Sequence, residues 1–79
     1  MVGLEKRLAV LLLAKADTQG VVSLSQEELA RHLGTIREVV SRLLRNLVAQ
    51  KLIALAPRRI TILDPARLRA VADAAPDPV

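Results

Sequence analysis

The sequence contains no phenylalanine, tyrosine, tryptophan or cysteine, and each absence excludes a class of site. Without cysteine the chain has no disulfide, iron–sulfur cluster or thiolate zinc site. Without aromatic rings it lacks the platforms on which proteins stack the bases of RNA or single-stranded DNA. Its one histidine, His32, is too few for a histidine metal site. Aliphatic side chains must therefore form the core of the 79-residue chain, which we expect to be one domain over residues 1–79.

Catalytic groups in a recognisable arrangement are missing as well. The acidic residues stand mostly at the ends of expected helices, and the sequence has no nucleophile–base pair and no phosphate-binding glycine loop. We therefore predict that the chain is not an enzyme. The same observations predict that this segment holds no catalytic residue, no metal ligand and no cofactor.

The apolar runs are too short to cross a membrane, since Leu8–Ala14 falls far below the roughly 20 residues required. The preceding Lys6-Arg7 pair and the small residues of Ala14-Lys15-Ala16 leave a secretory leader as one alternative. Glu5, in what should be a purely positive leader, favours the other alternative, a buried helix. We accordingly expect a cytoplasmic protein without a membrane partner.

The charge of the chain is positive and unevenly distributed. The formal net charge is +4 and the isoelectric point is near 10.7. Within residues 37–59 the basic residues outnumber the single acid, Glu38, and give a local charge of +5 against a nearly neutral remainder. A concentrated positive segment is typical of a protein with a polyanionic partner. The basic residues of this segment are Arg37, Arg42, Arg45, Lys51, Arg58 and Arg59.

Apolar residues at helical spacing predict a first helix that follows Gly3 and is ended by Thr18-Gln19-Gly20. The residues that mark it are Leu4, Leu8, Leu11, Leu12 and Lys15. Its middle is apolar on nearly every side, because Val10 and Leu13 lie away from the main apolar stripe. A surface helix should have a polar back. We therefore expect this helix to contact a second apolar surface, supplied by missing sequence or by another subunit.

Two further helices have the spacing of a helix-turn-helix. Ser25 and Glu28 form a capping box that predicts a second helix from Gln26 to about Leu33. Gly34 then stops the helix, because glycine readily takes the positive φ of a helix end. A third helix opens within residues 35–37 and continues to about residue 51. A short helix, a glycine turn and a longer helix are the order of a helix-turn-helix motif.

The remaining segments predict strands and one more helix. Residues 21–24 are β-prone, and residues 52–56 and 60–63 indicate a β-hairpin with a basic tip at Pro57-Arg58-Arg59. Asp64-Pro65 starts a last helix, in which Leu68 and Val71 are expected to dock on the domain. The tail, residues 76–79, is expected to fray.

Together these elements predict an α+β fold, a winged helix-turn-helix. It combines a three-helix core with a small antiparallel β-sheet wing and a short carboxy-terminal helix. We place the helix-turn-helix at residues 25–48 and the wing hairpin at residues 52–63.

The third helix has one polar, cation-rich face and one apolar face. At about 100° per residue, its polar side chains fall within an arc of about 140° that begins in the first turn. Its apolar side chains occupy an arc of about 100° on the opposite side. This pattern is typical of a helix that docks in the major groove of DNA by its amino-terminal end. The polar set is Arg37, Glu38, Ser41, Arg42 and Arg45, and the apolar set is Val40, Leu43, Leu44 and Leu47.

These residue types match the chemistry of the groove. Arginine can donate two parallel hydrogen bonds to guanine, and a carboxylate can accept one from cytosine N4. We therefore predict that Arg37, Glu38 and Arg42 contact bases. Phosphate contacts, which hold the register on the duplex, are predicted for Ser41, Arg45, Arg58 and Arg59. Two alternatives stay open: Glu38 as a helix cap, and the wing arginines as charges that blunt an exposed hairpin.

Residues 34–44, Gly-Thr-Ile-Arg-Glu-Val-Val-Ser-Arg-Leu-Leu, resemble the recognition-helix signature of the Crp/Fnr transcription regulators, G-x-[ST]-R-E-x-[VI]-[SG]-R. The resemblance extends upstream over residues 24–30 and downstream through residues 52–53 and 59–63. It implies a winged-helix fold and a homodimer that binds an inverted-repeat operator in double-stranded DNA, with RNA polymerase as a further partner. It also implies that the residues matching Arg37, Glu38 and Arg42 read the half-site.

The sensory domain and the long dimerisation helix of that family have no counterpart in this sequence. We therefore interpret the chain as the carboxy-terminal DNA-binding part of a larger regulator. Its predicted function is sequence-specific binding of double-stranded DNA in transcription regulation. The alternative is a winged-helix adaptor that binds protein without reading DNA, which the apolar first helix favours.

The sequence departs from the signature at three positions. Ile36 stands where the family usually has serine or threonine, so the third helix lacks its expected cap there. Thr35 is expected to cap the helix instead, with Glu38 completing a second capping box. Val39 replaces a common threonine, and Pro57 stands at the hairpin tip where the family often has glycine.

Overall fold

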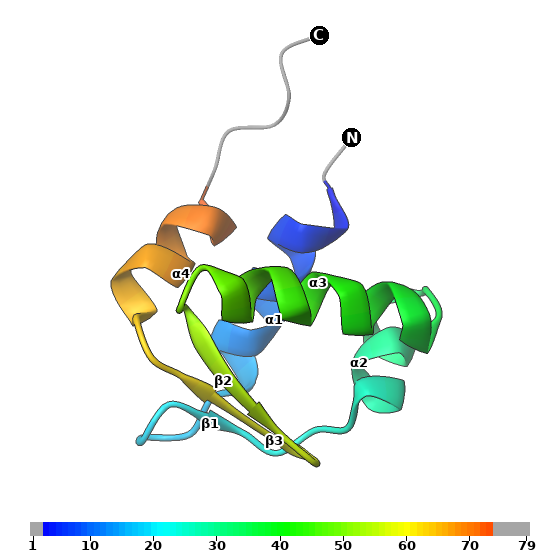
Figure 1. The fold of residues 1–79 in the computed structure, drawn as a ribbon, viewed down its shortest axis with the longest axis horizontal. Helices are drawn as coiled ribbons and strands as arrows, with labels where there is room; N and C mark the ends of the chain where they lie inside the picture. The colour runs from blue at the N-terminus through cyan, green and yellow to red at the C-terminus, as the bar shows by residue number, and fades with distance from the viewer. Residues whose placement is uncertain (1–2, 74–79) are drawn as a thin grey trace, which may run out of the picture.

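The computed structural model describes residues 3–73, which form four helices and a small sheet (Figure 1). The predicted fraying of residues 76–79 lies outside the described residues. Within the described part of the chain, no helix is long and apolar enough to cross a membrane. The elements are α1 (Leu4–Lys15), β1 (Val21–Val22), α2 (Gln26–Leu33), α3 (Arg37–Ala49), β2 (Ile53–Ala56), β3 (Arg59–Ile62) and α4 (Pro65–Ala72).

The start and end of α2 follow from the residues that flank it. The Ser25 side chain accepts a hydrogen bond from the Glu28 backbone N–H at 3.1 Å, and the Glu28 carboxylate accepts one from the Ser25 N–H at 3.3 Å. The predicted capping box is therefore confirmed. Gly34 takes a left-handed conformation with φ 69°, and Thr35 N–H bonds back to Ala30. This bond pattern ends α2 and turns the chain into α3.

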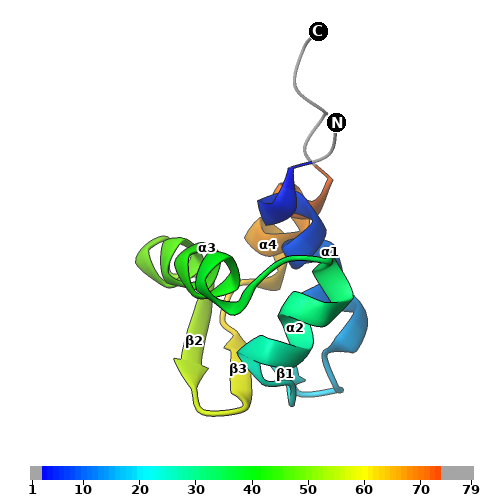
Figure 2. The same ribbon diagram turned by 90° about the vertical axis from the view of Figure 1, so that its right-hand side faces the viewer.

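Helix α1 packs most extensively against α4, and the two lie side by side in both ribbon views (Figures 1 and 2). Leu8, Ala9 and Leu12 are buried on α1, and Leu68 is fully buried on α4. The chain's own α4 therefore supplies one apolar surface against α1, reached because Asp64 and its following proline turn the chain back onto α1. Val10 stays 49% exposed, so the expected contact of this side of α1 with missing sequence or another subunit remains a prediction.

The sheet is antiparallel and has the strand order β1-β3-β2. β1 pairs through Val21 with Thr61 and through Val22 with Ile60. β2 and β3 form the predicted hairpin, but its turn is shorter than expected. Only residues 57–58 lie outside the strands, because Arg59 already pairs with Ala56.

The core is entirely aliphatic, as the composition requires, and no polar or charged residue of the described chain is buried within it. Every helix and strand contributes to it. The fully or nearly fully buried side chains are Leu8, Ala9, Leu12, Val22, Leu29, Ala30, Leu33, Val40, Leu44, Leu47, Leu52, Ile53, Ile60, Leu68 and Ala72. This core fixes α3 against α2 and the sheet, with one face of α3 turned outward.

The architecture is thus a winged helix-turn-helix, as predicted. α2 and α3 form the helix-turn-helix, and β2 and β3 form the wing beside it (Figure 2). Helix α3 ends two residues earlier than expected, because Lys51 adopts φ 62° and Leu52 N–H bonds back to Leu47. This is the same kind of ending as that of α2, with lysine in place of glycine.

Candidate nucleic-acid interface

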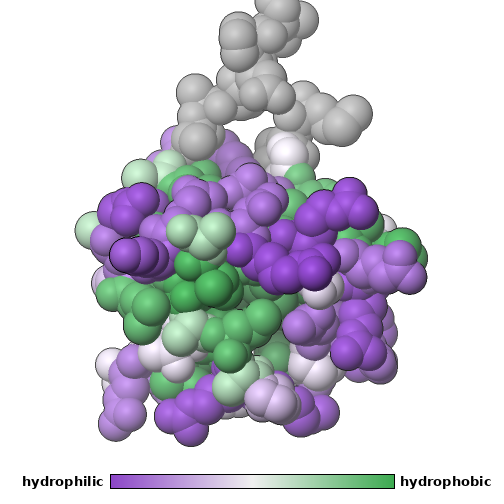
Figure 3. Space-filling view, viewed as in Figure 1, coloured by the Kyte–Doolittle hydropathy of each residue, from purple (hydrophilic) through white to green (hydrophobic). Residues whose placement is uncertain are grey.

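The predicted polar face of α3 is an exposed surface. Val40, Leu44 and Leu47 are fully buried on one side of the helix. The other side carries the polar set: Arg37, Glu38, Arg42 and Arg45 are exposed and Ser41 is half-buried. The space-filling view shows hydrophilic side chains along α3, above an apolar area over the strands (Figure 3). The helix therefore presents these side chains together, from its first turn onward.

The first turn of α3 has no side-chain cap. Ile36 occupies the cap position with an extended backbone, φ −105° and ψ 158°. The second capping box expected from Thr35 and Glu38 does not form in the described structure, so that prediction was wrong. Its physical reason is position: with Ile36 as the cap residue, Val39 rather than Glu38 is the third helical residue. Glu38 therefore has no capping role, although it still lies in the positive first turn of the helix.

Replacing Ile36 with serine is expected to stabilise the domain by about 0.5–1 kcal/mol, since serine can accept a hydrogen bond that isoleucine cannot. Little packing is lost, because Ile36 is 61% exposed. Urea unfolding followed by far-ultraviolet circular dichroism measures the change, as the chain has no aromatic residue for fluorescence. Ile36→Val is the matched control, because valine also lacks an acceptor. Equal stability of the serine and valine variants would contradict the prediction.

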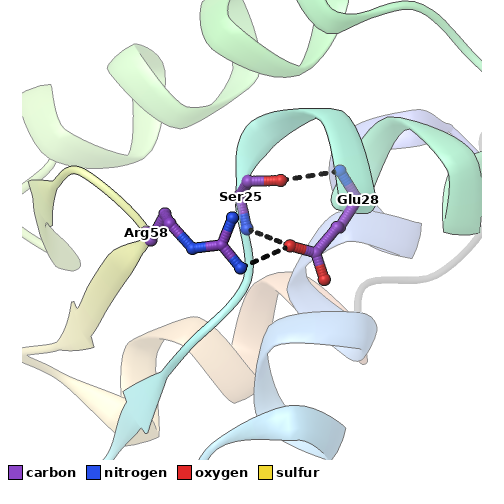
Figure 4. Close-up of polar contacts among 3 residues, drawn as sticks. All are labelled: Ser25, Glu28 and Arg58. Atoms are coloured by element: carbon purple, nitrogen blue, oxygen red, sulfur yellow. Dashed lines mark hydrogen bonds and ion pairs between the residues drawn. The ribbon is translucent and has the colours of Figure 1, made fainter.

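Acidic residues of α2 pair with two of the predicted DNA-contacting arginines. Arg37 Nη1 lies 3.7 Å from Glu27 Oε1, and both side chains are well exposed. Arg58 Nη2 lies 3.1 Å from Glu28 Oε1, and this pair joins the wing turn to the first turn of α2 (Figure 4). Exposed pairs of this kind are worth little in stability. In this structure they direct both guanidinium groups toward the start of α2.

Glu28 is the most heavily bonded carboxylate at this surface. Its Oε1 atom accepts from both the Ser25 backbone N–H and the Arg58 guanidinium (Figure 4). Hydrogen bonds from the Ser25 backbone and side chain lower the pKa of Glu28 below its ordinary value, and the positive charges of Arg58 and Arg31 act in the same direction. The carboxylate therefore stays ionised at neutral pH.

Arg59 begins β3 and is exposed, one residue beyond the turn. The charge of Arg59 acts on Asp17, which lies in the bend between α1 and β1. Asp17 Oδ1 accepts hydrogen bonds from Val21 N–H at 2.9 Å and Gln19 N–H at 2.8 Å. These bonds lower the pKa of Asp17, and Arg59 adds a smaller electrostatic contribution in the same direction. No ion pair of Arg59 is found among the described residues.

Two surface hollows connect the start of α3, at Arg37, with the wing turn, at Arg58. One, of about 640 Å³, lies at the start of α3 and is lined by Gln26, Ile36, Arg37, Glu38 and Ser41. The other, of about 540 Å³, lies between the wing and the starts of α2 and α3. Gln26 and Arg37 line both. The recognition-helix residues and the wing turn therefore border one continuous surface, although the chain separates them by some twenty residues.

The α2 side of this surface was not predicted from the sequence. The pattern of residues 26–28 indicated only the start of a helix, yet Glu27 and Glu28 pair with arginines and Gln26 lines both hollows. A helix wheel of α2 would have placed Glu27 on its exposed side. Among residues 3–73, no group of three or more histidine or acidic side chains is arranged to hold a metal ion.

Comparison with known proteins assigns this fold and surface to a family. Residues 6–71 match the Crp-like helix-turn-helix domain. The transcriptional regulator LdrP of Thermus thermophilus is 42% identical in an alignment 80 residues long, and the match covers 91% of this chain and 41% of that protein. The chain thus spans less than half the length of this curated relative.

Solved structures agree with that match. A CRP-family transcriptional regulator, also from Thermus thermophilus, superposes with a TM-score of 0.82 at 38% identity, covering 95% of this chain and 43% of that protein. A protein of Eubacterium rectale, described as a regulator of the Crp/Fnr family, gives a TM-score of 0.81 at 38% identity, covering 89% and 33% of the two chains. On sequence and on structure, this chain belongs to the Crp-like helix-turn-helix domain family of the Crp/Fnr transcription regulators.

Proposed function

We propose that this chain is the sequence-specific, double-stranded-DNA-binding part of a transcription regulator. The observation that carries the proposal is the exposed polar face of α3, which begins in the first turn and lies beside the wing. A helix that enters the major groove by its amino-terminal end brings such a face against the base edges. Family membership supports the same function.

In this proposal, Arg37 and Arg42 donate paired hydrogen bonds to guanine, and Glu38 accepts one from cytosine. The first turn of α3 carries Arg37 and Glu38 in succession, and Arg42 follows four residues after Glu38, a spacing that places these two side chains on the same face. Without a capping role, the Glu38 carboxylate is available for a base donor. Repulsion from phosphates makes that donor necessary for Glu38 to contribute favourably.

Phosphate contacts would hold the helix in register. Ser41 and Arg45 flank the base-reading residues on α3, and Arg59 adds a positive charge on the wing. Arg58 differs from them, because Glu28 already binds its guanidinium. The whole regulator would bind an inverted repeat as a homodimer in the cytoplasm, with this chain as its carboxy-terminal part and RNA polymerase as a further partner.

Salt dependence tests the proposal. A labelled DNA duplex, selected from a random pool by the chain itself, is titrated at several salt concentrations by fluorescence anisotropy. The logarithm of the binding constant should fall linearly with the logarithm of salt, with a slope of about −0.9 for each phosphate contacted. Arg45→Gln should make that slope smaller by about 0.9, the contribution of one phosphate contact. Failure to select any sequence, or a slope near zero, would contradict the proposed function.

One observation favours a different function, a protein–protein adaptor. A groove of about 320 Å³ runs along α1 beside the end of α2, lined by apolar Val10, Leu11, Ala14 and Leu33 and by basic side chains. Val10 is 49% exposed there. An adaptor that binds protein through this groove would select no DNA duplex, or would bind DNA with a salt slope near zero, so the same selection and titration separate the two functions. Val10→Ser should leave DNA binding unchanged if the DNA proposal is correct.

A further inference from the structure

The wing turn places an arginine where the backbone disfavours one. Arg58 has φ 54°, in the left-handed region that glycine and asparagine adopt most readily. Glycine at this position would relieve the strain and leave the two-residue turn intact. A non-glycine residue in this region is a reason to ask what its side chain contacts. The contacts of Arg58 supply the answer.

The Arg58 side chain reaches across the hollow between the wing and the helix-turn-helix. One side of this hollow is the start of α2 and the other is the wing, including Leu55, Pro57 and Arg58. Residues 54–59 are all exposed, so no buried apolar contact holds the wing turn in place. The Arg58–Glu28 pair, at 3.1 Å, joins two segments that lie 30 residues apart in the sequence.

The partner of Arg58 is itself firmly placed. Glu28 is half-buried, with 27% of its side chain exposed, whereas 72% of the Arg58 side chain is exposed. Glu28 is fixed by its exchange of hydrogen bonds with Ser25 at the start of α2 (Figure 4). The Glu28 carboxylate is therefore the held partner of the pair, and the more exposed Arg58 side chain docks on it.

We propose that Arg58 is a positioning residue that latches the wing turn to the α2 capping box through Glu28, rather than a direct phosphate contact. The latch fixes the angle between the wing and α3, and so sets where Arg59 meets the DNA backbone. This inference rests on the proposed function for its effect on DNA binding. The latch itself is a property of the free chain.

The first test needs no DNA. Amide hydrogen exchange of wing residues is measured by NMR in the wild type and in Arg58→Asn, because asparagine tolerates the left-handed backbone and removes the guanidinium. Glu28→Gln is the matched partner variant, because glutamine can still complete a capping box. We expect each variant to speed amide exchange in the wing about two- to five-fold, the factor that corresponds to the loss of an exposed ion pair. The double variant should show no further increase, because both changes remove the same interaction. Additive effects of the two changes would overturn the latch.

A pH titration of the same samples supplies an independent readout. The pKa of Glu28 is lowered in the wild type, so the latch is present at neutral pH and is lost as pH falls through that lowered value. Arg58→Asn should raise the pKa of Glu28 only by the share that the Arg58 charge contributes, because the larger lowering by the Ser25 hydrogen bonds remains. Arg59→Gln, which removes the same charge one residue away, should move it much less. Equal shifts in the two variants would mean that Glu28 senses only the overall charge of the wing, which contradicts the latch.

The second test uses the selected duplex. If Arg58 is a positioning residue, Arg58→Asn lowers the affinity about two- to five-fold and leaves the salt slope unchanged. A slope smaller by about 0.9 would show that Arg58 contacts a phosphate, and an unchanged affinity would show that the latch does not position the wing. Either result overturns the proposal. If the wild type selects no DNA, the proposed function fails, while the exchange and titration measurements still decide whether the latch exists.

Discussion

Replacing Leu44 with alanine is expected to lower the free energy of unfolding by about 2–5 kcal/mol. The Leu44 side chain is completely buried on the inner face of α3, between Val40 and Leu47. Truncation removes apolar contacts and leaves a cavity that the surrounding helices and strands fill only in part. The free energy of unfolding of a domain of this size exceeds that loss by only a few kcal/mol. The variant should therefore be largely unfolded or melt far below the wild type.

Thermal unfolding followed by far-ultraviolet circular dichroism measures this effect. A loss of 1 kcal/mol lowers the melting temperature of a domain of 60–100 residues by about 4–8 °C, so a decrease of more than about 8 °C is expected. Leu63→Ala is the matched control, because the same side chain is 56% exposed there. Similar melting temperatures for the two variants would show that α3 does not depend on Leu44 for its packing.

The largest expected effect on function comes from Arg37. Arg37→Ala should weaken binding to the selected duplex by about 1–3 kcal/mol, roughly five- to 150-fold, and should relax the choice at one base pair. In the free chain Arg37 is exposed, with Glu27 as a distant ionic partner at 3.7 Å. That weak pairing costs little to exchange for guanine, whose two acceptors match the guanidinium.

Arg37→Lys and Arg69→Ala sharpen the Arg37 experiment. Lysine keeps the charge but cannot donate the paired hydrogen bonds, so it should bind nearly as poorly as alanine on the selected sequence. Arg69→Ala removes an exposed charge from α4, outside the proposed interface, and should change affinity much less. Unaltered binding by a folded Arg37→Ala variant would refute the assignment of this residue as a base reader.

Elements with local signals could be predicted from the sequence almost to the residue. The start of α2 follows from Ser25 and Glu28, its end from Gly34, and the start of α4 from Asp64-Pro65. Each signal lies within four residues of the boundary it sets, so no tertiary contact is needed to interpret it. The two-faced pattern of α3 was equally local, and it placed the exposed polar face correctly.

Features that depend on distant or unusual residues could not be predicted. The end of α3 was misplaced because Lys51 takes the left-handed conformation usually signalled by glycine. The packing of α4 on α1 was not identified because that contact joins opposite ends of the chain. The pairing of Arg58 with Glu28 spans 30 residues, and charge alone cannot identify which acid an arginine reaches.

The central position of β3 gives the wing a mechanical connection to the far side of the domain. β3 pairs with β2 at four positions but with β1 at only two, Val21 with Thr61 and Val22 with Ile60. Along the chain, β3 also leads after two residues into α4, so the strand that carries the wing turn is linked to β1 on one side and to α4 at its end. Because α4 packs along α1, the wing and the helix pair on the opposite side of the molecule belong to one connected framework (Figure 2).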